Sequence, residues 1–357
     1  MDKTITTSDV IGKDPFGRLL AKIRIRPWQA ALVSFSFFLV YMFLLPAIYG
    51  VLFPRAGLER SSIIDRTNHV GFLIVHPVII FFFVWQSSAI SKLYDLVLPL
   101  APKGVQDKLS RAARITHKGR NWWVIGFLVG SVFVYLGVVN ALANLFRIWF
   151  TINWLMIVIL QVSRLLLFYM IVNIVVRHLV TALNLNRIYR EVHLPVLVVR
   201  TNLGAAFDGI SNYGLSFTGF SAMLGLFLGM RYFYSTPLFP EDAIYLALYF
   251  ILIPFSFFLP FWQAHVKMRA AREEALDRIS ESLQAEYDRS MSGFDGDSNK
   301  QISSERLVHL RELLLITQQA PTWPFETSSI YRLFGTAVLP FVLPALGYLG
   351  DILSLIR

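Results

Sequence analysis

Seven long apolar runs, separated by polar and charged segments, dominate the chain. They cover residues 28–53, 70–90, 122–146, 152–176, 210–230, 243–262 and 330–356. Each run is long enough to cross roughly 30 Å of hydrocarbon as a helix that rises about 1.5 Å per residue. The pattern therefore predicts an all-α, polytopic integral membrane protein with about seven transmembrane helices.

The basic residues are distributed unevenly between the two sides of these runs. If the spans alternate in direction, the segments on the side of the N-terminus hold 25 of the 33 Lys and Arg residues, and the opposite segments hold 6. Only Arg164 and Arg332 fall inside spans. By the positive-inside rule, the N-terminus is expected in the cytoplasm and the C-terminus outside.

Composition agrees with a membrane protein and excludes several other classes. The chain of 357 residues is 55% apolar and only 16% charged, and its formal charge is +10. Because Lys and Arg cluster at the predicted inner ends of the spans, anionic lipid headgroups explain the positive charge and a nucleic-acid partner is not expected. The first apolar run starts too late and is too long for a cleaved signal peptide. We expect a multi-pass protein of a plasma or inner membrane.

Four segments follow from this layout. Residues 1–27 form a polar, cytoplasmic N-terminal arm, and residues 28–262 form a membrane domain of six spans. Residues 263–320 are expected to form a cytoplasmic helical hairpin with a flexible linker at 290–303, which has the composition SMSGFDGDSNKQIS. Residues 321–357 form a final membrane helix that follows the proline-broken sequence APTWPFE.

Apolar residues at helical spacing predict how the cytoplasmic segments pack. One stripe precedes the linker and another follows it, so the two helices are expected to pack as an antiparallel pair or to meet other subunits. Residues 177–191 contain neither Gly nor Pro, which predicts that the fourth span continues as a helix into the cytoplasm. A third stripe, after the second span, is expected to lie along the membrane interface. The three stripes are Leu276, Ile279 and Leu283; Leu307, Leu310 and Leu314; and Leu93, Leu96, Val97 and Leu100.

Small residues and prolines mark the last spans. In the fifth span, Gly225 and Gly229 follow Ser221 at a spacing that lets two helices approach closely, which indicates either tight packing or the wall of a cavity or pore. The final span carries Pro340 and Pro344 one turn apart, so it is expected to be kinked or locally opened. These four positions are candidates for a pore or substrate site.

Arg164 is the most unusual single position, because it lies near the middle of an otherwise apolar span. On insertion scales, placing a guanidinium at this depth costs about 2.5–3.5 kcal/mol. Arg164 therefore needs hydrogen-bonding partners or water. No other predicted span has an acidic residue at its centre. Arg164 is therefore expected either to reach Asp208 or backbone carbonyls, or to face a wet cavity where it acts on a bound or permeating species. Gln161 shares its helix face and favours the cavity.

The motifs of several enzyme classes are missing from the sequence. There is no phosphate-binding Gly-rich loop, no HExxH zinc motif and no Ser in a nucleophile elbow. The chain has no Cys, and His76 has no second His or acid at helical spacing, so no metal or other cofactor is expected. An enzymatic function is not expected.

The layout resembles the seven-helix ligand-gated ion channels of the insect odorant and gustatory receptor type. The features in common are seven spans with an inward N-terminus, helices that continue the middle spans into the cytoplasm, and a last span split at APTWPFE. The resemblance is one of topology, and it implies a homo-oligomer whose last span lines the pore. We therefore expect a homo-oligomeric membrane channel that responds to a small molecule or ion. The alternatives are a secondary transporter with a midplane site around Arg164 and a signalling or scaffold protein that acts through its cytoplasmic helices.

Overall fold

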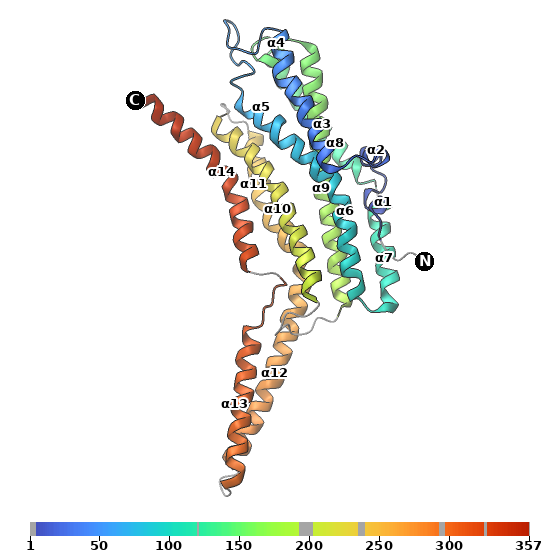
Figure 1. Ribbon diagram of the computed structural model, residues 1–357, viewed down its shortest axis with the longest axis vertical. Coiled ribbons are helices and arrows are strands. Elements are labelled where there is room, and N and C mark those ends of the chain that lie inside the picture. The colour runs from blue at the N-terminus through green and yellow to red at the C-terminus, as the bar shows by residue number, and fades with distance from the viewer. Residues whose placement is uncertain are drawn as a thin grey trace.

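The computed structural model describes residues 5–119, 121–192, 203–234, 240–292, 297–324 and 327–356. In these residues the protein is a bundle of long helices from which a two-helix hairpin projects (Figure 1). Seven helical segments are long and apolar enough to cross a membrane, and they fall on the seven apolar runs of the sequence. The polytopic all-α class is thus confirmed.

The bundle has a hairpin end, from which the hairpin projects, and a loop end, which carries the connection between α4 and α5 (Figure 1). The described helices are α1 (Thr7–Ile11), α2 (Pro15–Ile23), α3 (Pro27–Leu39), α4 (Leu45–Ile48), α5 (Arg66–Val70), α6 (His76–Val97), α7 (Lys103–Lys118), α8 (Trp123–Ala143), α9 (Trp154–Glu191), α10 (Leu203–Tyr234), α11 (Pro240–Phe258), α12 (Trp262–Ser292), α13 (Asp297–Gln319) and α14 (Thr327–Ile356).

Prolines explain two wide turns inside the first two spans. A π-helical stretch, Val40–Leu44, joins α3 to α4, and another, Gly71–Val75, joins α5 to α6. Each stretch ends two residues before a proline, and a proline supplies no N–H to the carbonyl four residues before it. For Pro46 that carbonyl belongs to Met42, and the Ser62 hydroxyl donates a hydrogen bond to it over 2.5 Å. The first span therefore continues through Pro46 without an orphaned carbonyl at Met42.

The middle spans continue well beyond the length that a bilayer needs. α9 is a single helix of 38 residues, which confirms the predicted extension over residues 177–191. α6 also continues, up to Val97, and the side chains of Leu93 and Val97 are buried in a cluster with residues of α9 and α10. The prediction that this stripe lies along the membrane interface is therefore wrong for Leu93 and Val97, which neighbouring helices cover, whereas Leu96 is 44% exposed.

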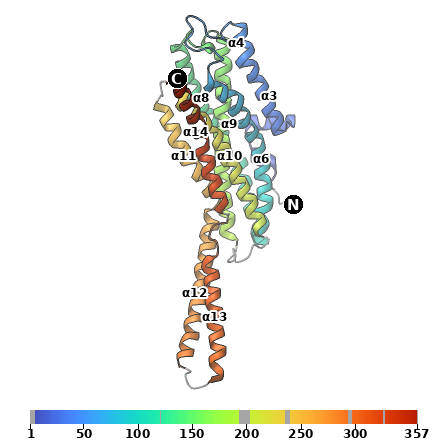
Figure 2. The same ribbon diagram turned by 60° about the vertical axis from the view of Figure 1, so that its left-hand side comes forward.

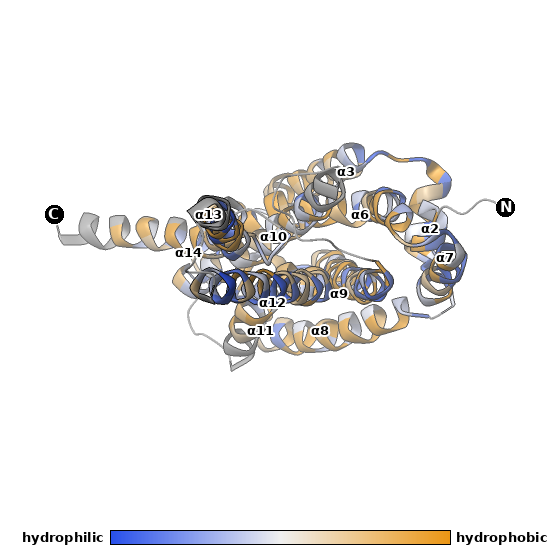
Figure 3. Ribbon diagram, turned by 90° about the horizontal axis from the view of Figure 1, so that it is seen from below, coloured by the Kyte–Doolittle hydropathy of each residue, from blue (hydrophilic) through white to orange (hydrophobic). Residues whose placement is uncertain are grey.

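α12 and α13 form the expected antiparallel hairpin, and Figure 2 shows it projecting as a long, thin unit. The six residues of the two predicted stripes are partly buried. The helices are longer than expected, since residues 290–292 and 297–303 of the predicted linker are helical and residues 293–296 lie outside the described part. Figure 3 shows many hydrophilic residues on α12, in contrast to the apolar helices around the bundle.

The N-terminal arm packs against the bundle. Ile5 and Val10 are buried in the same cluster as Leu93 and Val97, and the Ser91 hydroxyl donates a hydrogen bond to the carbonyl of Ile5 over 2.6 Å. At the opposite edge, α14 lies beside α10 and α11, and its C-terminal half diverges from the bundle (Figure 1). The N-terminal arm is therefore a structural part of the bundle.

Candidate functional site

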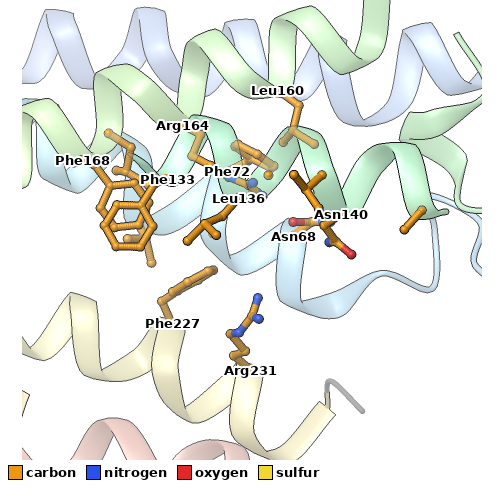
Figure 4. Close-up of a pocket in the computed structure, with 16 residues that line it drawn as sticks. Asn68, Phe72, Phe133, Leu136, Asn140, Leu160, Arg164, Phe168, Phe227 and Arg231 are labelled. Carbon is orange, nitrogen blue, oxygen red and sulfur yellow. The ribbon is translucent and has the colours of Figure 1, made fainter. Parts of the chain in front are cut away.

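A cavity of about 420 Å³ lies between α5 and the π-helical stretch after it, α8, α9 and α10. Figure 4 shows Arg164 entering it from α9 and Arg231 from α10 on the opposite side. Among the described residues that line the cavity these are the two charged side chains, and none is acidic. The cavity thus combines the sequence candidate Arg164 with a second arginine, which directly follows the apolar run of residues 210–230.

Glycines on α8 allow α9 to bring Arg164 into the cavity. A methyl group at Gly137 would collide with the Arg164 guanidinium, so glycine leaves the space that this side chain occupies. Two further glycines make the same close approach: a methyl at Gly126 would lie 2.5 Å from Nδ2 of Asn173, and one at Gly130 would lie 2.9 Å from Cδ1 of Leu165. Arg164 lies ten residues into α9, roughly 15 Å from its start. Close packing of α8 on α9 therefore fixes the guanidinium deep in the bundle.

The cavity has an aromatic part and a polar part. Phe133 of α8 stacks on Phe168 of α9, with ring centroids 3.7 Å apart and an angle of 13° between the planes. Phe227 of α10 lies across the cavity from them (Figure 4). Asn68 and Asn140 lie on the other side, near Arg231 (Figure 4). A molecule in this space would meet aromatic rings at one end and guanidinium and amide groups at the other.

A second cavity, of about 440 Å³, lies next to the first at the loop end. Its lining includes Arg60, Arg66 and Tyr234, and the guanidinium carbon of Arg66 lies 5.1 Å from the centroid of the Tyr234 ring. Tyr234 follows Arg231 by one turn of α10. The lining also includes Asp65, whose carboxylate lies 3.8 Å from Arg60 and accepts hydrogen bonds from Asn68 and Trp149. The lining of this cavity thus combines two arginines with one carboxylate.

Gln161, the other sequence candidate on α9, is buried behind Arg164. Its side chain is 6% exposed, and neither atom of its amide has a hydrogen-bond partner among the described residues. A methyl group at Gly137 would lie 2.5 Å from its Oε1 atom. Gln161 is thus beside the cavity, where its amide remains available for a hydrogen bond.

Asp208 lies far from this cavity. It precedes Arg231 by 23 residues on α10, which corresponds to roughly 35 Å along the helix axis. Arg164 lines the same cavity as Arg231, and the side chain of Asp208 lies outside the described part of the structure. The helix geometry therefore supports the cavity interpretation of Arg164 and not the ion pair with Asp208.

The remaining candidates form a separate contact on the other side of α10. A methyl group at Gly225 would collide with the ring and hydroxyl of Tyr249. One at Gly229 would lie 3.0 Å from the carbonyl of Pro340 and 3.3 Å from Cγ of Pro344. These glycines let α11 and α14 approach α10 closely, as the tight-packing interpretation predicts. Both prolines lie inside α14 and face α10.

Sequence reasoning missed a buried ion pair between the N-terminal arm and α9. Arg177 donates a hydrogen bond to the carboxylate of Asp14, and their side chains are 7% and 5% exposed. The Tyr169 hydroxyl donates to the same carboxylate, and the Arg177 guanidinium lies 4.5 Å from the centroid of the Phe83 ring. These groups hold the arm at the bundle.

The described residues contain no group of three or more His, Asp or Glu side chains that could hold a metal ion. His76 instead pairs through Nδ1 with the hydroxyl of Ser34, over 2.9 Å. The cavity itself offers guanidinium and amide groups together with aromatic rings, which suit an anion and apolar groups.

Comparison with known proteins adds no relative from which a function could be transferred. No protein-family model matches the chain, no curated protein matches it, and no solved structure matches it. The function must therefore be argued from the geometry.

Proposed function

We propose that the protein is a homo-oligomeric membrane channel that is gated by a small molecule in the Arg164 cavity, with α14 lining a pore between subunits. The observation that carries the proposal is the position of α10, which separates the cavity from α14. Phe227 and Arg231 line the cavity, whereas Gly225 and Gly229 contact α11 and α14. Residues two positions apart on a helix point in nearly opposite directions.

This arrangement offers a direct mechanical connection between ligand and pore. Because Gly229 packs closely against Pro340 and Pro344, a shift of α10 caused by a ligand would also displace α14. The Tyr249 hydroxyl donates a hydrogen bond to the carbonyl of Ala337 over 3.1 Å, which joins α11 to the same part of α14. A ligand that binds two positions of α10 with different affinity would shift the population of pore conformations.

α14 also has a side that could face a pore. Leu333, Ala337 and Phe341 pack against α10 and α11, and the opposite side is exposed. A ring of apolar side chains from several subunits could close a pore by excluding water. The large apolar residues on this exposed side are Phe334, Val338, Leu339, Val342 and Leu346.

The hairpin supports assembly into an oligomer. α13 lies outside the apolar spans, yet four of its large apolar side chains are about half exposed. Burial of apolar area contributes roughly 25 cal/mol per Å², so covering these side chains with a second copy of the hairpin would stabilise an oligomer. The four residues are Val308, Leu313, Leu315 and Ile316.

Electrical recording tests the proposal. The purified protein in a planar bilayer should give discrete current steps. Its mass in lipid nanodiscs should be a multiple of the 40.8 kDa subunit mass. A monomeric protein that gives no current steps would contradict the channel proposal.

The two arginines in an intrasubunit cavity also favour a second function, a secondary transporter for an anion. Such a protein would show saturable counterflow of its substrate in liposomes and no unitary currents. Discrete steps would exclude it.

A further inference from the structure

Two positive charges face one cavity of limited size. Arg164 and Arg231 enter it from opposite walls, and no acidic side chain is among the described residues that line it. Charges interact more strongly in a protein interior than in water, so an anion between the two guanidinium groups would be attracted to both. Arginine is well suited to this role because its planar guanidinium binds a carboxylate through two parallel hydrogen bonds.

The rest of the cavity suits an apolar group. The stacked rings of Phe133 and Phe168 lie at the end remote from Asn68 and Asn140, and Phe227 lies opposite them (Figure 4). A volume of about 420 Å³ falls in the range of roughly 300–1,000 Å³ that is typical of small-molecule pockets. A single inorganic anion would leave the aromatic part unfilled.

We propose that this cavity binds a small carboxylic acid with an apolar body, such as a medium-chain fatty acid or an aryl acid. The carboxylate lies between Arg164 and Arg231, and the body lies against Phe133, Phe168 and Phe227. The inference rests on the proposed function, since it names the ligand class of the same cavity.

Equilibrium binding to the full chain in nanodiscs of zwitterionic lipid tests this directly, with radiolabelled decanoate as the probe and empty nanodiscs as background. Wild-type protein should bind decanoate saturably. Arg164→Gln and Arg231→Gln should each weaken binding about tenfold or more, as expected for loss of a hydrogen bond to a charged group. Arg147→Gln is the matched control, because Arg147 is an exposed arginine that pairs with Glu59 and does not line the cavity.

Gly137→Ala gives an independent perturbation that keeps both charges. Its methyl group displaces the Arg164 guanidinium, so decanoate binding should weaken although no arginine is removed. Far-UV circular dichroism and elution volume identify any variant that does not fold. If a glutamine variant does not fold, the lysine variant at the same position, Arg164→Lys or Arg231→Lys, is tested in its place. Each lysine variant keeps the charge and loses the bidentate geometry, so each should bind decanoate more weakly than wild type.

Competition identifies the ligand class. Decanol, which has the body without the charge, should not displace decanoate, and acetate should do so only at a far higher concentration. Equal displacement by decanol, equal potency of acetate, absence of saturable binding to the wild-type protein, or unchanged binding in the folded cavity variants would each overturn the inference. Because binding is measured without current, absence of binding in a protein that gives current steps refutes this inference alone. Binding without any current refutes the channel alone.

Discussion

The ion pair between Asp14 and Arg177 gives the sharpest prediction about stability. The Asp14 carboxylate accepts hydrogen bonds from Arg177, from the Tyr169 hydroxyl and from the backbone N–H of Gly17, the last over 3.0 Å. It therefore caps the first turn of α2 and neutralises a buried guanidinium at the same time. Removing one partner of a buried pair leaves an uncompensated charge and costs roughly 3–5 kcal/mol.

The expected loss of folding stability depends on which property of Asp14 is removed. Asp14→Asn keeps the N-cap and an acceptor for Arg177, so we expect a loss near the lower limit, about 3 kcal/mol. Asp14→Ala also removes the N-cap, so this variant should be about 1 kcal/mol less stable than Asp14→Asn. Arg177→Met leaves the carboxylate buried and should be as damaging as Asp14→Asn. The double variant Asp14→Asn with Arg177→Met should recover most of the loss, because the lone charge is gone.

The assay is unfolding in mixed micelles, titrated with a denaturing detergent and followed by tryptophan fluorescence. Glu273→Ala is the control, because Glu273 pairs with Arg269 on the exposed surface of α12 and such pairs contribute little. If Asp14→Asn unfolds like this control, or if the double variant is as unstable as the sum of the single ones, the ion pair does not hold the N-terminal arm.

Three further predictions concern topology, the hairpin and the α10–α11 contact. A reporter fused after residue 357 should be external and one inserted at residues 293–296 cytoplasmic, as judged by impermeant labelling; a cytoplasmic C-terminus would contradict the seven-span topology. Ile279→Asp should lower the oligomer fraction in size-exclusion chromatography because it places a charge in the partly buried stripe of α12, whereas Ser280→Asp at the neighbouring exposed position should not; equal tolerance would mean that the stripe is solvated. Gly225→Ala should lower the melting temperature because its methyl group collides with Tyr249, whereas Gly335→Ala, whose methyl meets open space, should not.

The sequence predicts the spans well and the contacts between them poorly. Length and composition identify a membrane helix locally, so all seven runs were found. α9 was correctly extended because residues 177–191 lack Gly and Pro. The stripe that contains Leu93 and Val97 was misplaced because a helix at the interface and a helix covered by its neighbours have the same apolar period. Whether α9 and α10 pack against this stripe decides between a helix at the interface and a covered helix, and the sequence does not show that packing.

The candidate site shows the same limit. Arg164 stands out in the sequence because it interrupts an apolar run, and its depth alone indicates a cavity. Arg231 lies at the end of a span, where a basic residue is ordinary, so nothing local marks it as part of the same cavity. Gly126 and Gly130 on α8 do follow a close-packing spacing, but the sequence does not say that α9 is their partner. Likewise, Asp14 and Arg177 are visible separately, and 163 positions separate them.

The central claim, that α14 lines a pore between subunits, can be tested on this chain without background because it contains no cysteine. Single cysteines are introduced along α14 from Thr336 to Leu346, and current in planar bilayers is recorded before and after a charged thiol reagent. The account predicts that modification blocks current at positions that recur every three to four residues on the exposed side, such as Val338 and Val342. A cysteine at the exposed position Leu128 of α8 should have no effect. Current that is unaffected at every α14 position, or blocked equally at Leu128, would contradict a pore formed by this helix.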